Sequence, residues 1–199
     1  MADMEKTGKN LEGRGFRVHR FASGAEAAEF LVQTLHGTSI GIGGSVTIDT
    51  LGVYDRLCES NEVFWHWKNH APETRERAGK AETYLCSANG VSENGEIVNI
   101  DGFGNRVAGT IYGPERVFLV AGRNKIAPDL TSAIDRARNI AAPLNARRLN
   151  RHTPCAVGEP RCHDCRSPEK ICGVMTVFFM PPTSIKEFHV LLVNEDLGY

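Results

Sequence analysis

The sequence predicts one α/β domain with a mostly parallel sheet flanked by helices. Short apolar runs that fit strands alternate along the chain with longer segments in which apolar residues recur every three or four positions, as in amphipathic helices. This alternation is typical of a parallel sheet with helices packed on it. The chain of 199 residues suits a single domain with a substantial core. We therefore expect residues 1–199 to form one domain, in which residues 1–37 make an N-terminal strand and helix region.

Local signals place the elements in order along the chain. Ser23 is a favourable N-cap for the first helix, which Gly37 ends. Asn94-Gly95 lies between two alternating runs and predicts a hairpin turn. Pro143 lies inside the longest helical pattern, where it is expected to kink or end the helix. The expected strands are residues 16–21, 39–44, 62–67, 83–87, the two arms of the hairpin within 90–102, 116–122, 174–180 and 188–194; the expected helices are residues 25–36, 46–60 (despite Gly52), 73–81 and 129–149.

Composition excludes several classes of protein. Lys and Arg number 23 against 24 Asp and Glu, so a general surface for nucleic acid or acidic membranes is not indicated. The N-terminal segment carries charges where a signal peptide needs an apolar run, and no stretch approaches the roughly 20 apolar residues of a membrane span. We expect a cytoplasmic protein that binds neither nucleic acid nor membrane. A local basic patch at Arg147, Arg148 and Arg151 is typical of a solvated helix end and also suits the neighbourhood of an anion.

A polar, proline-punctuated loop at residues 152–173 is rich in cysteine. It has almost no apolar face to bury, so the clustering of thiols predicts a metal site, either zinc or an iron–sulfur cluster. Disulfides, which belong to oxidising compartments, and free thiols are the alternatives. Cys58 and Cys86 lie in or beside apolar runs and are expected to be buried structural thiols. The candidate metal ligands follow the pattern Cys-x6-Cys-x2-Cys-x6-Cys and are Cys155, Cys162, Cys165 and Cys172.

A second chemical motif follows the strand expected at residues 39–44. Gly43 and Gly44 end this strand, and Ser45 and Thr47 begin the next helix. Bare backbone N–H groups and the helix dipole favour negative charge at such a turn. The motif lacks both the Walker ending and the dinucleotide glycine spacing, so no nicotinamide or flavin site is predicted. A tight turn with an N-cap explains the same residues without any ligand.

Polar side chains also follow other buried strands. Ligands of open α/β sheets bind at the carboxyl ends of the strands, so these side chains predict a site for a small polar or anionic molecule. Ordinary turn chemistry and solvated strand ends are the alternatives. The candidate ligand-binding residues in these loops are Ser87, Asn89, Asp101, Asn105, Asn124 and Lys125.

Together, these motifs resemble the lactate-utilisation (LUD) domain family. The resemblance rests on GIGGSVT, SANGVSENGEIVNIDGFGNRVA, YGPERVFLVAGRNKI, AAPLNARRL and the cysteine loop, and it extends from about residue 40 to the closing LLVNEDLGY. It implies a fold similar to ribose-5-phosphate isomerase, glucosamine-6-phosphate deaminase and the coenzyme A transferases. It also implies a cytoplasmic protein linked to the oxidation of lactate to pyruvate.

The resemblance carries further expectations for ligand, cofactor and partners. In this fold the first glycine-rich strand end binds phosphate or carboxylate, a role that would fall here to residues 43–47, with Asn124 and Lys125 nearby. A small anionic metabolite is thus the expected ligand. Iron–sulfur subunits of the same pathway are the expected partners, and a redox pathway favours a 4Fe–4S cluster over zinc at the cysteine loop. A homo-oligomer is left open.

Two other functions stay open at this point. Ser92-Glu93-Asn94-Gly95 resembles the signature of coenzyme A transferases, in which Glu93 would be the nucleophile that forms a covalent acyl intermediate. The chain would otherwise be a zinc-stabilised ligand-binding or regulatory module. Lactate oxidation by this chain alone is not expected, because removal of a hydride needs a flavin, nicotinamide or metal acceptor.

Overall fold

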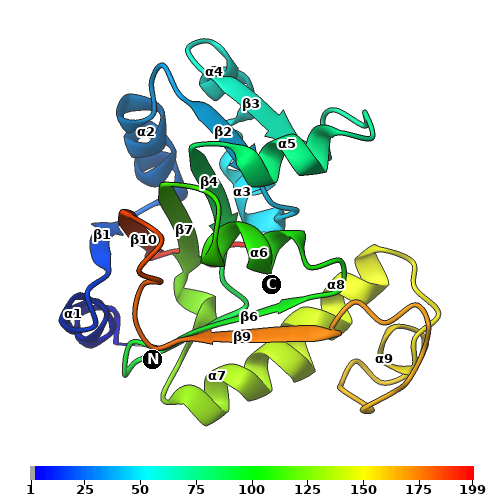
Figure 1. The fold of residues 1–199 in the computed structure, drawn as a ribbon. Helices are drawn as coiled ribbons and strands as arrows, with labels where there is room; N and C mark the ends of the chain where they lie inside the picture. Colours follow the sequence, from blue (N-terminus) through cyan, green and yellow to red (C-terminus); the bar gives the residue numbers. More distant parts are fainter. Residues whose placement is uncertain (1–2) are drawn as a thin grey trace.

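A six-stranded sheet forms the centre of the computed structural model, which describes residues 3–199 (Figure 1). The strand order is β1-β10-β7-β4-β2-β3, and every neighbouring pair is parallel. The predicted parallel α/β domain is therefore confirmed. The strands of this sheet are β1 (Arg17–Phe21), β2 (Ser39–Ile42), β3 (Glu62–Trp65), β4 (Thr83–Ser87), β7 (Arg116–Gly122) and β10 (Glu187–Val193).

A second sheet of four strands, in the order β8-β5-β6-β9, was not predicted as a separate unit. It comprises β5 (Gly90–Ser92), β6 (Ile97–Asp101), β8 (Ile126–Ala127) and β9 (Val174–Phe178). β5 and β6 form the antiparallel hairpin predicted from Asn94-Gly95, and Gly95 adopts a positive φ of 90° in its turn. The strand expected at 174–180 pairs with β6 and does not join the parallel sheet.

Two of the expected helices differ from the observed ones, one at a glycine and one at a proline. Ser23 caps α2 as expected, accepting a hydrogen bond from the Glu26 amide. Gly52, with φ 64°, instead ends α3, so the predicted helix over 46–60 is two short helices. Pro143 lacks an N–H and was expected to kink or end the helix. The helix instead continues through a π-helical turn that precedes Pro143. The helices are α1 (Met4–Gly13), α2 (Gly24–Thr34), α3 (Val46–Leu51), α4 (Tyr54–Cys58), α5 (Thr74–Lys80), α6 (Asn105–Ile111), η1 (Arg123–Lys125), α7 (Leu130–Arg136), η2 (Ala137–Ala141), α8 (Ala142–Arg148) and α9 (Pro154–Val157).

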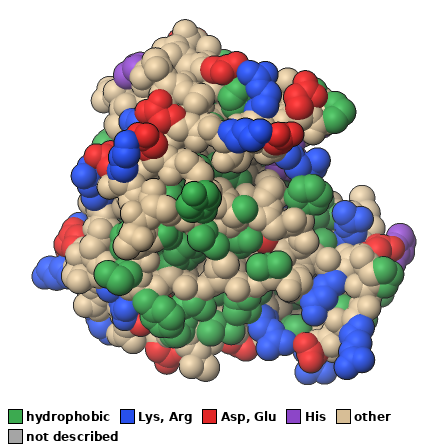
Figure 2. All heavy atoms as spheres, in the orientation of Figure 1, with side chains coloured by type: hydrophobic (Ala, Val, Ile, Leu, Met, Phe, Trp, Pro, Cys, Tyr) green, Lys and Arg blue, Asp and Glu red, His purple; other side chains and the backbone are tan. Residues whose placement is uncertain are grey.

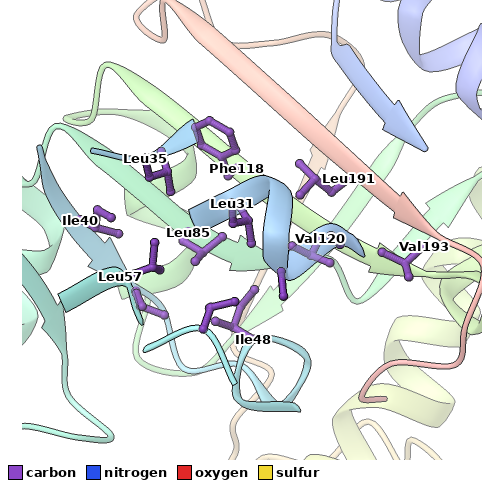
Figure 3. Close-up of a cluster of buried hydrophobic side chains, with 14 of the residues drawn as sticks. Leu31, Leu35, Ile40, Ile48, Leu57, Leu85, Phe118, Val120, Leu191 and Val193 are labelled. Carbon is purple, nitrogen blue, oxygen red and sulfur yellow. The ribbon is translucent and has the colours of Figure 1, made fainter. Parts of the chain in front are cut away.

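The parallel sheet is covered on both faces by apolar cores. On one face, α2, α3 and α4 pack on strands β2, β4, β7 and β10, as Figure 3 shows for Leu31, Ile48 and Phe118. On the other face, Leu11 of α1 and Ile97 of β6 pack against the sheet. These two cores hold the central strands β4 and β7 rigidly, with their carboxyl ends at one edge.

The second sheet has its own two faces, because neighbouring residues of a strand point in opposite directions. Ile97 belongs to the core beneath the parallel sheet, whereas Val98 packs against Ala133 of α7 and Ala137 of η2. The long α7–η2–α8 helix is thereby fixed beside β6 (Figure 1). No helix within residues 3–199 is long and apolar enough to span a bilayer.

Candidate functional site

A cavity of about 630 Å³ lies at the carboxyl ends of β2, β4 and β7, beside the end of β6. Its inner part is formed by the turn after β2 and by the residues that follow β4, β6 and β7. Its outer part is formed by the loop after β3, by α5 and α8, and by the cysteine-rich loop. Figure 2 shows the surface hollowed between α5 and this loop, at the right of the view. Tyr199 also lines the cavity.

Lys125 lies at the inner end of the cavity and is 2% exposed. Its Nζ donates hydrogen bonds to Thr47 Oγ1, at 2.7 Å, and to the Ala88 carbonyl, at 3.0 Å. Burial, together with the charges of Arg136 and Arg106, lowers the pKa of Lys125 to about 7. Lys125 lies in the 3-10 turn after β7. Its side chain is therefore only partly protonated at neutral pH.

Two hydroxyl residues of the glycine-rich turn are fixed beside this lysine. Ser45 caps α3 by accepting a hydrogen bond from the Ile48 amide, at 3.2 Å, and its Oγ lies 2.8 Å from Ser87 Oγ. Thr47 accepts from Lys125 and donates to the Leu197 carbonyl, at 3.2 Å. The turn thus brings hydroxyl groups from β2 and β4 to the inner wall of the cavity.

Asp101 and Asn89 organise the wall next to β6. Asp101 accepts hydrogen bonds from the amides of Phe103 and Arg106, at 3.2 and 2.8 Å, and so caps the start of α6. Asn89 Oδ1 accepts from the Ile100 amide and from the Arg106 guanidinium, which also donates to the Ile100 carbonyl. Both side chains line the cavity, but their polar atoms already stabilise the loops.

The outer wall combines aromatic and cationic side chains. The Arg148 guanidinium lies 4.7 Å from the centre of the Trp67 ring, and that of Arg75 lies 5.0 Å from the centre of the Phe103 ring. His66 lies nearby, and its pKa is lowered by burial and by the charges of Arg75 and His70. The carboxylate side chains of the lining are Asp101 and Glu169, and its Lys and Arg side chains are Arg75, Arg106, Lys125, Arg148, Arg151 and Lys170. The excess of positive charge favours an anionic ligand.

Most of the candidate ligand-binding residues lie together on this cavity. Gly43 and Asn124 do not. A Cβ at position 43 would come within 2.8 Å of Arg106 Cγ, so this glycine allows close packing. Asn124 donates to the Gly198 carbonyl and accepts from the Leu197 amide, both at 3.1 Å, and so anchors the C-terminal segment. The predicted residues that do line the cavity are Gly44, Ser45, Thr47, Ser87, Asn89, Asp101, Asn105 and Lys125.

The sequence reading missed the residues contributed by the loop after β3 and by α5. The missed residues that line the cavity are His66, Trp67, His70 and Arg75. The basic residues before the cysteine loop could have indicated part of the outer wall, because Arg148 and Arg151 line the cavity as well.

The cysteine-rich loop gathers its thiols without closing them into a ligand shell. Burial raises the pKa of Cys172; the positive charge of Lys170 opposes this shift, and the neighbouring thiols Cys162, Cys165 and Cys155 add to it. Four cysteine side chains are a donor set that suits zinc or an iron–sulfur cluster. Within residues 3–199, however, no group of three or more His, Cys, Asp or Glu side chains is arranged to hold a metal ion.

The remaining cysteines and Glu93 lie elsewhere. Cys86 is buried as expected, whereas Cys58 is exposed at the end of α4, so its predicted burial was wrong. Glu93 lies in the β5–β6 turn, where it accepts hydrogen bonds from the Asp3 amide and from Lys6 Nζ, at 3.1 and 3.0 Å. These bonds lower the pKa of Glu93. The structure therefore does not bring Glu93 to the cavity, where a nucleophile would be needed.

Comparisons with known proteins identify a family and a fold. A family model described as the LUD domain matches residues 4–193. The crystal structure of a DUF162 family protein from Deinococcus radiodurans is similar to this chain, with a TM-score of 0.56 and 12% sequence identity, covering 96% of this chain and 95% of that chain. At this identity the likeness concerns the fold alone. No curated protein matches the sequence.

Proposed function

The chain belongs to the LUD domain family, and from that premise we propose that it binds a small anionic metabolite as a subunit or accessory protein of an iron–sulfur-dependent system that oxidises lactate to pyruvate. The single observation that carries the binding role is the charge of the cavity. Six Lys and Arg side chains and two carboxylate side chains line it. One of these carboxylates, Asp101, is already occupied by backbone N–H groups.

The basic side chains extend from the mouth of the cavity to its inner end. Arg75, Arg148 and Arg151 are exposed near the mouth, while Arg106 is half-buried and Lys125 is buried. A guanidinium can bind a carboxylate through two parallel hydrogen bonds. We therefore expect a monocarboxylate such as lactate or pyruvate to bind with its carboxylate on one of these guanidinium groups.

The family resemblance supports the proposed pathway and partners, and the cysteine-rich loop lies at the cavity. Glu169, Lys170 and Ile171 of this loop line the cavity, immediately before Cys172. Cys155, Cys162, Cys165 and Cys172 would hold a 4Fe–4S cluster or zinc. An iron–sulfur cluster would supply one-electron transfer, and zinc would supply structural order alone. Since the chain has no dinucleotide fingerprint, partner subunits would provide the remaining electron carriers.

The binding role is tested by calorimetric titration of the protein with lactate and pyruvate. Arg148→Gln is expected to weaken binding about 10- to 150-fold, because loss of one charge-assisted hydrogen bond corresponds to about 1.5–3 kcal/mol. Arg56→Gln is the matched control, since Arg56 pairs with Glu29 on the surface outside the cavity. The absence of any binding of either acid to wild type would contradict the proposal, and equal affinity in wild type and Arg148→Gln would assign the carboxylate to another guanidinium group of the cavity.

The metal role is tested on protein purified without oxygen, by analysis of iron, zinc and acid-labile sulfide together with the visible spectrum. Iron and sulfide that are lost in Cys162→Ser and kept in Cys58→Ser would support the electron-transfer role. One zinc per chain would favour the regulatory-module alternative. Protein without bound metal would remove the cluster from the proposal.

A further inference from the structure

The Lys125 side chain has the surroundings of a neutral amine. An ammonium group carries three N–H donors, whereas a neutral amine carries two and one lone pair. Thr47 Oγ1 and the Ala88 carbonyl accept two hydrogen bonds from Nζ. Within residues 3–199, no third acceptor and no carboxylate partner contacts this nitrogen. The two acceptors match the two N–H bonds of a neutral amine and leave its lone pair unused.

The charges around Lys125 also favour the neutral form of its amine. Arg136 donates to the carbonyls of Asn124 and Asn89, at 2.7 and 2.6 Å, so its guanidinium is fixed close to the lysine. Arg106 is fixed by Asn89 and Ile100. The nearby Cys86 is fully buried, and burial raises the pKa of its thiol to about 12, so it supplies no negative charge at neutral pH. The two guanidinium groups favour loss of the lysine proton.

We propose that Lys125 is a nucleophile that forms a reversible imine with the ketone carbon of a 2-oxo acid bound in the cavity. This inference rests on the proposed role of the cavity as a site for small carboxylates. A 2-oxo acid matches the two kinds of group that the cavity presents. Its carboxylate suits the guanidinium groups, and its adjacent ketone carbon suits an amine with a free lone pair.

The reaction is a condensation without any change of oxidation state. The Nζ lone pair attacks the ketone carbon, a C–N bond forms, and the ketone oxygen becomes a hydroxyl group after it receives a proton from the nitrogen. The hydroxyl then leaves as water, taking up the second proton of the nitrogen, and a C=N bond remains. The Ser45–Ser87 hydroxyl pair lines the same cavity and is available to relay these protons. The amine and the ketone are thus converted to an imine and one water.

The environment of Lys125 sets it apart from the other lysines. A lysine with an ordinary pKa near 10.5 is almost fully protonated at neutral pH and therefore a poor nucleophile. Burial and the two guanidinium groups lower the pKa of Lys125 to about 7, so that about half of it is neutral at that pH. By contrast, Lys80 is exposed and pairs with Glu76. The expected selectivity for one lysine provides the test.

The experiment is borohydride trapping of the full-length protein with pyruvate and with 2-oxoglutarate, followed by peptide mapping by mass spectrometry. We expect a reduced adduct on Lys125, with a trapping rate that rises between pH 6 and pH 8. Lys125→Met should lose the adduct, and Lys80→Met should keep it. Lactate, which has no ketone, should compete with trapping and form no adduct. The mapping on wild type locates the modified residue even if Lys125→Met folds poorly.

Two outcomes would overturn the inference and can be told apart from a failure of the proposed function. If calorimetry shows that pyruvate binds but borohydride traps no adduct on Lys125, the imine is refuted and the binding role stands. If adducts spread over exposed lysines, with a rate that rises only toward pH 10, the selectivity of Lys125 is refuted. If neither acid binds nor is trapped, both proposals fail.

Discussion

Replacement of Lys125 by methionine tests how the buried amine is charged in the folded protein. Methionine keeps an unbranched apolar stem and removes the titrating group. Burial lowers the pKa of Lys125 from its ordinary 10.5 to about 7 in the folded protein, and the ordinary value applies to the unfolded chain. Between these two values the unfolded chain holds the proton and the folded protein does not. The stability of wild type therefore rises with pH across this window, relative to a chain without the lysine.

The magnitude follows from the two pKa values. Each pH unit in the window changes the free energy of unfolding by about 1.4 kcal/mol, so the buried charge costs about 5 kcal/mol at pH 7 and below. In Lys125→Met, the loss of the hydrogen bonds to Thr47 and Ala88 offsets about 1–3 kcal/mol of the stability that is gained by removing the buried charge. Lys125→Met should thus be about 2–4 kcal/mol more stable than wild type at pH 7, and this advantage should fall by about 3 kcal/mol at pH 9.

The assay is urea unfolding of wild type and Lys125→Met between pH 6 and pH 9. Lys80→Met is the control, because Lys80 is exposed and its stability difference from wild type should not depend on pH in this range. The other titrating groups are common to wild type and variant, so they cancel in the difference. A difference between Lys125→Met and wild type that stays constant from pH 6 to pH 9 would refute the reasoning.

Three further predictions concern packing, Glu93 and the C-terminal segment. Gly41→Ala places a Cβ 2.0 Å from the Ala78 carbonyl oxygen and should destabilise the fold by at least about 1–3 kcal/mol in thermal unfolding. By contrast, the Cβ added by Gly79→Ala in α5 contacts no atom within 4 Å, so this substitution should stabilise the fold by about 0.5–1 kcal/mol. Glu93→Gln should leave pyruvate binding unchanged in calorimetry, because Glu93 contacts Asp3 and Lys6 outside the cavity; a large loss of affinity would show that the turn takes part in binding. Asn124→Ala should release residues 197–199 to carboxypeptidase, because it removes the bonds to Leu197 and Gly198; digestion as slow as that of wild type would contradict this anchoring role.

The central sheet was predictable because its strands carry strong local signals. The run at 117–122 is apolar without interruption, and β7 has neighbours on both sides and two buried faces. The second sheet was not predictable in the same way. The strand expected at 174–180 is apolar enough for either sheet, and only its pairing with β6 decides between them. That pairing is a long-range contact that no local pattern encodes.

The inner part of the cavity was predictable and the outer part was not. Ser87 ends one recognisable buried strand, and Ser45 and Lys125 follow two others. Parallel strands bring their carboxyl ends to one edge. Trp67 and Arg75 come from a loop and a short helix with no such constraint, so their position depends on tertiary packing. Asn124 also follows β7, as the sequence indicates. Its side-chain amide nevertheless binds the C-terminal segment and does not line the cavity.

The double role of β6 has a consequence for the motions of the protein. Ile97 and Val98 belong to different cores, so β6 cannot separate from its neighbours without exposing apolar surface on both sides. Native-state hydrogen exchange should therefore find the amides of β6 and β7 among the slowest, opening only with the whole domain. The cysteine-rich loop has few backbone hydrogen bonds and should exchange early. A bound ligand would then contact an inner wall that is already ordered. The loss of conformational entropy on binding would occur mainly in this loop.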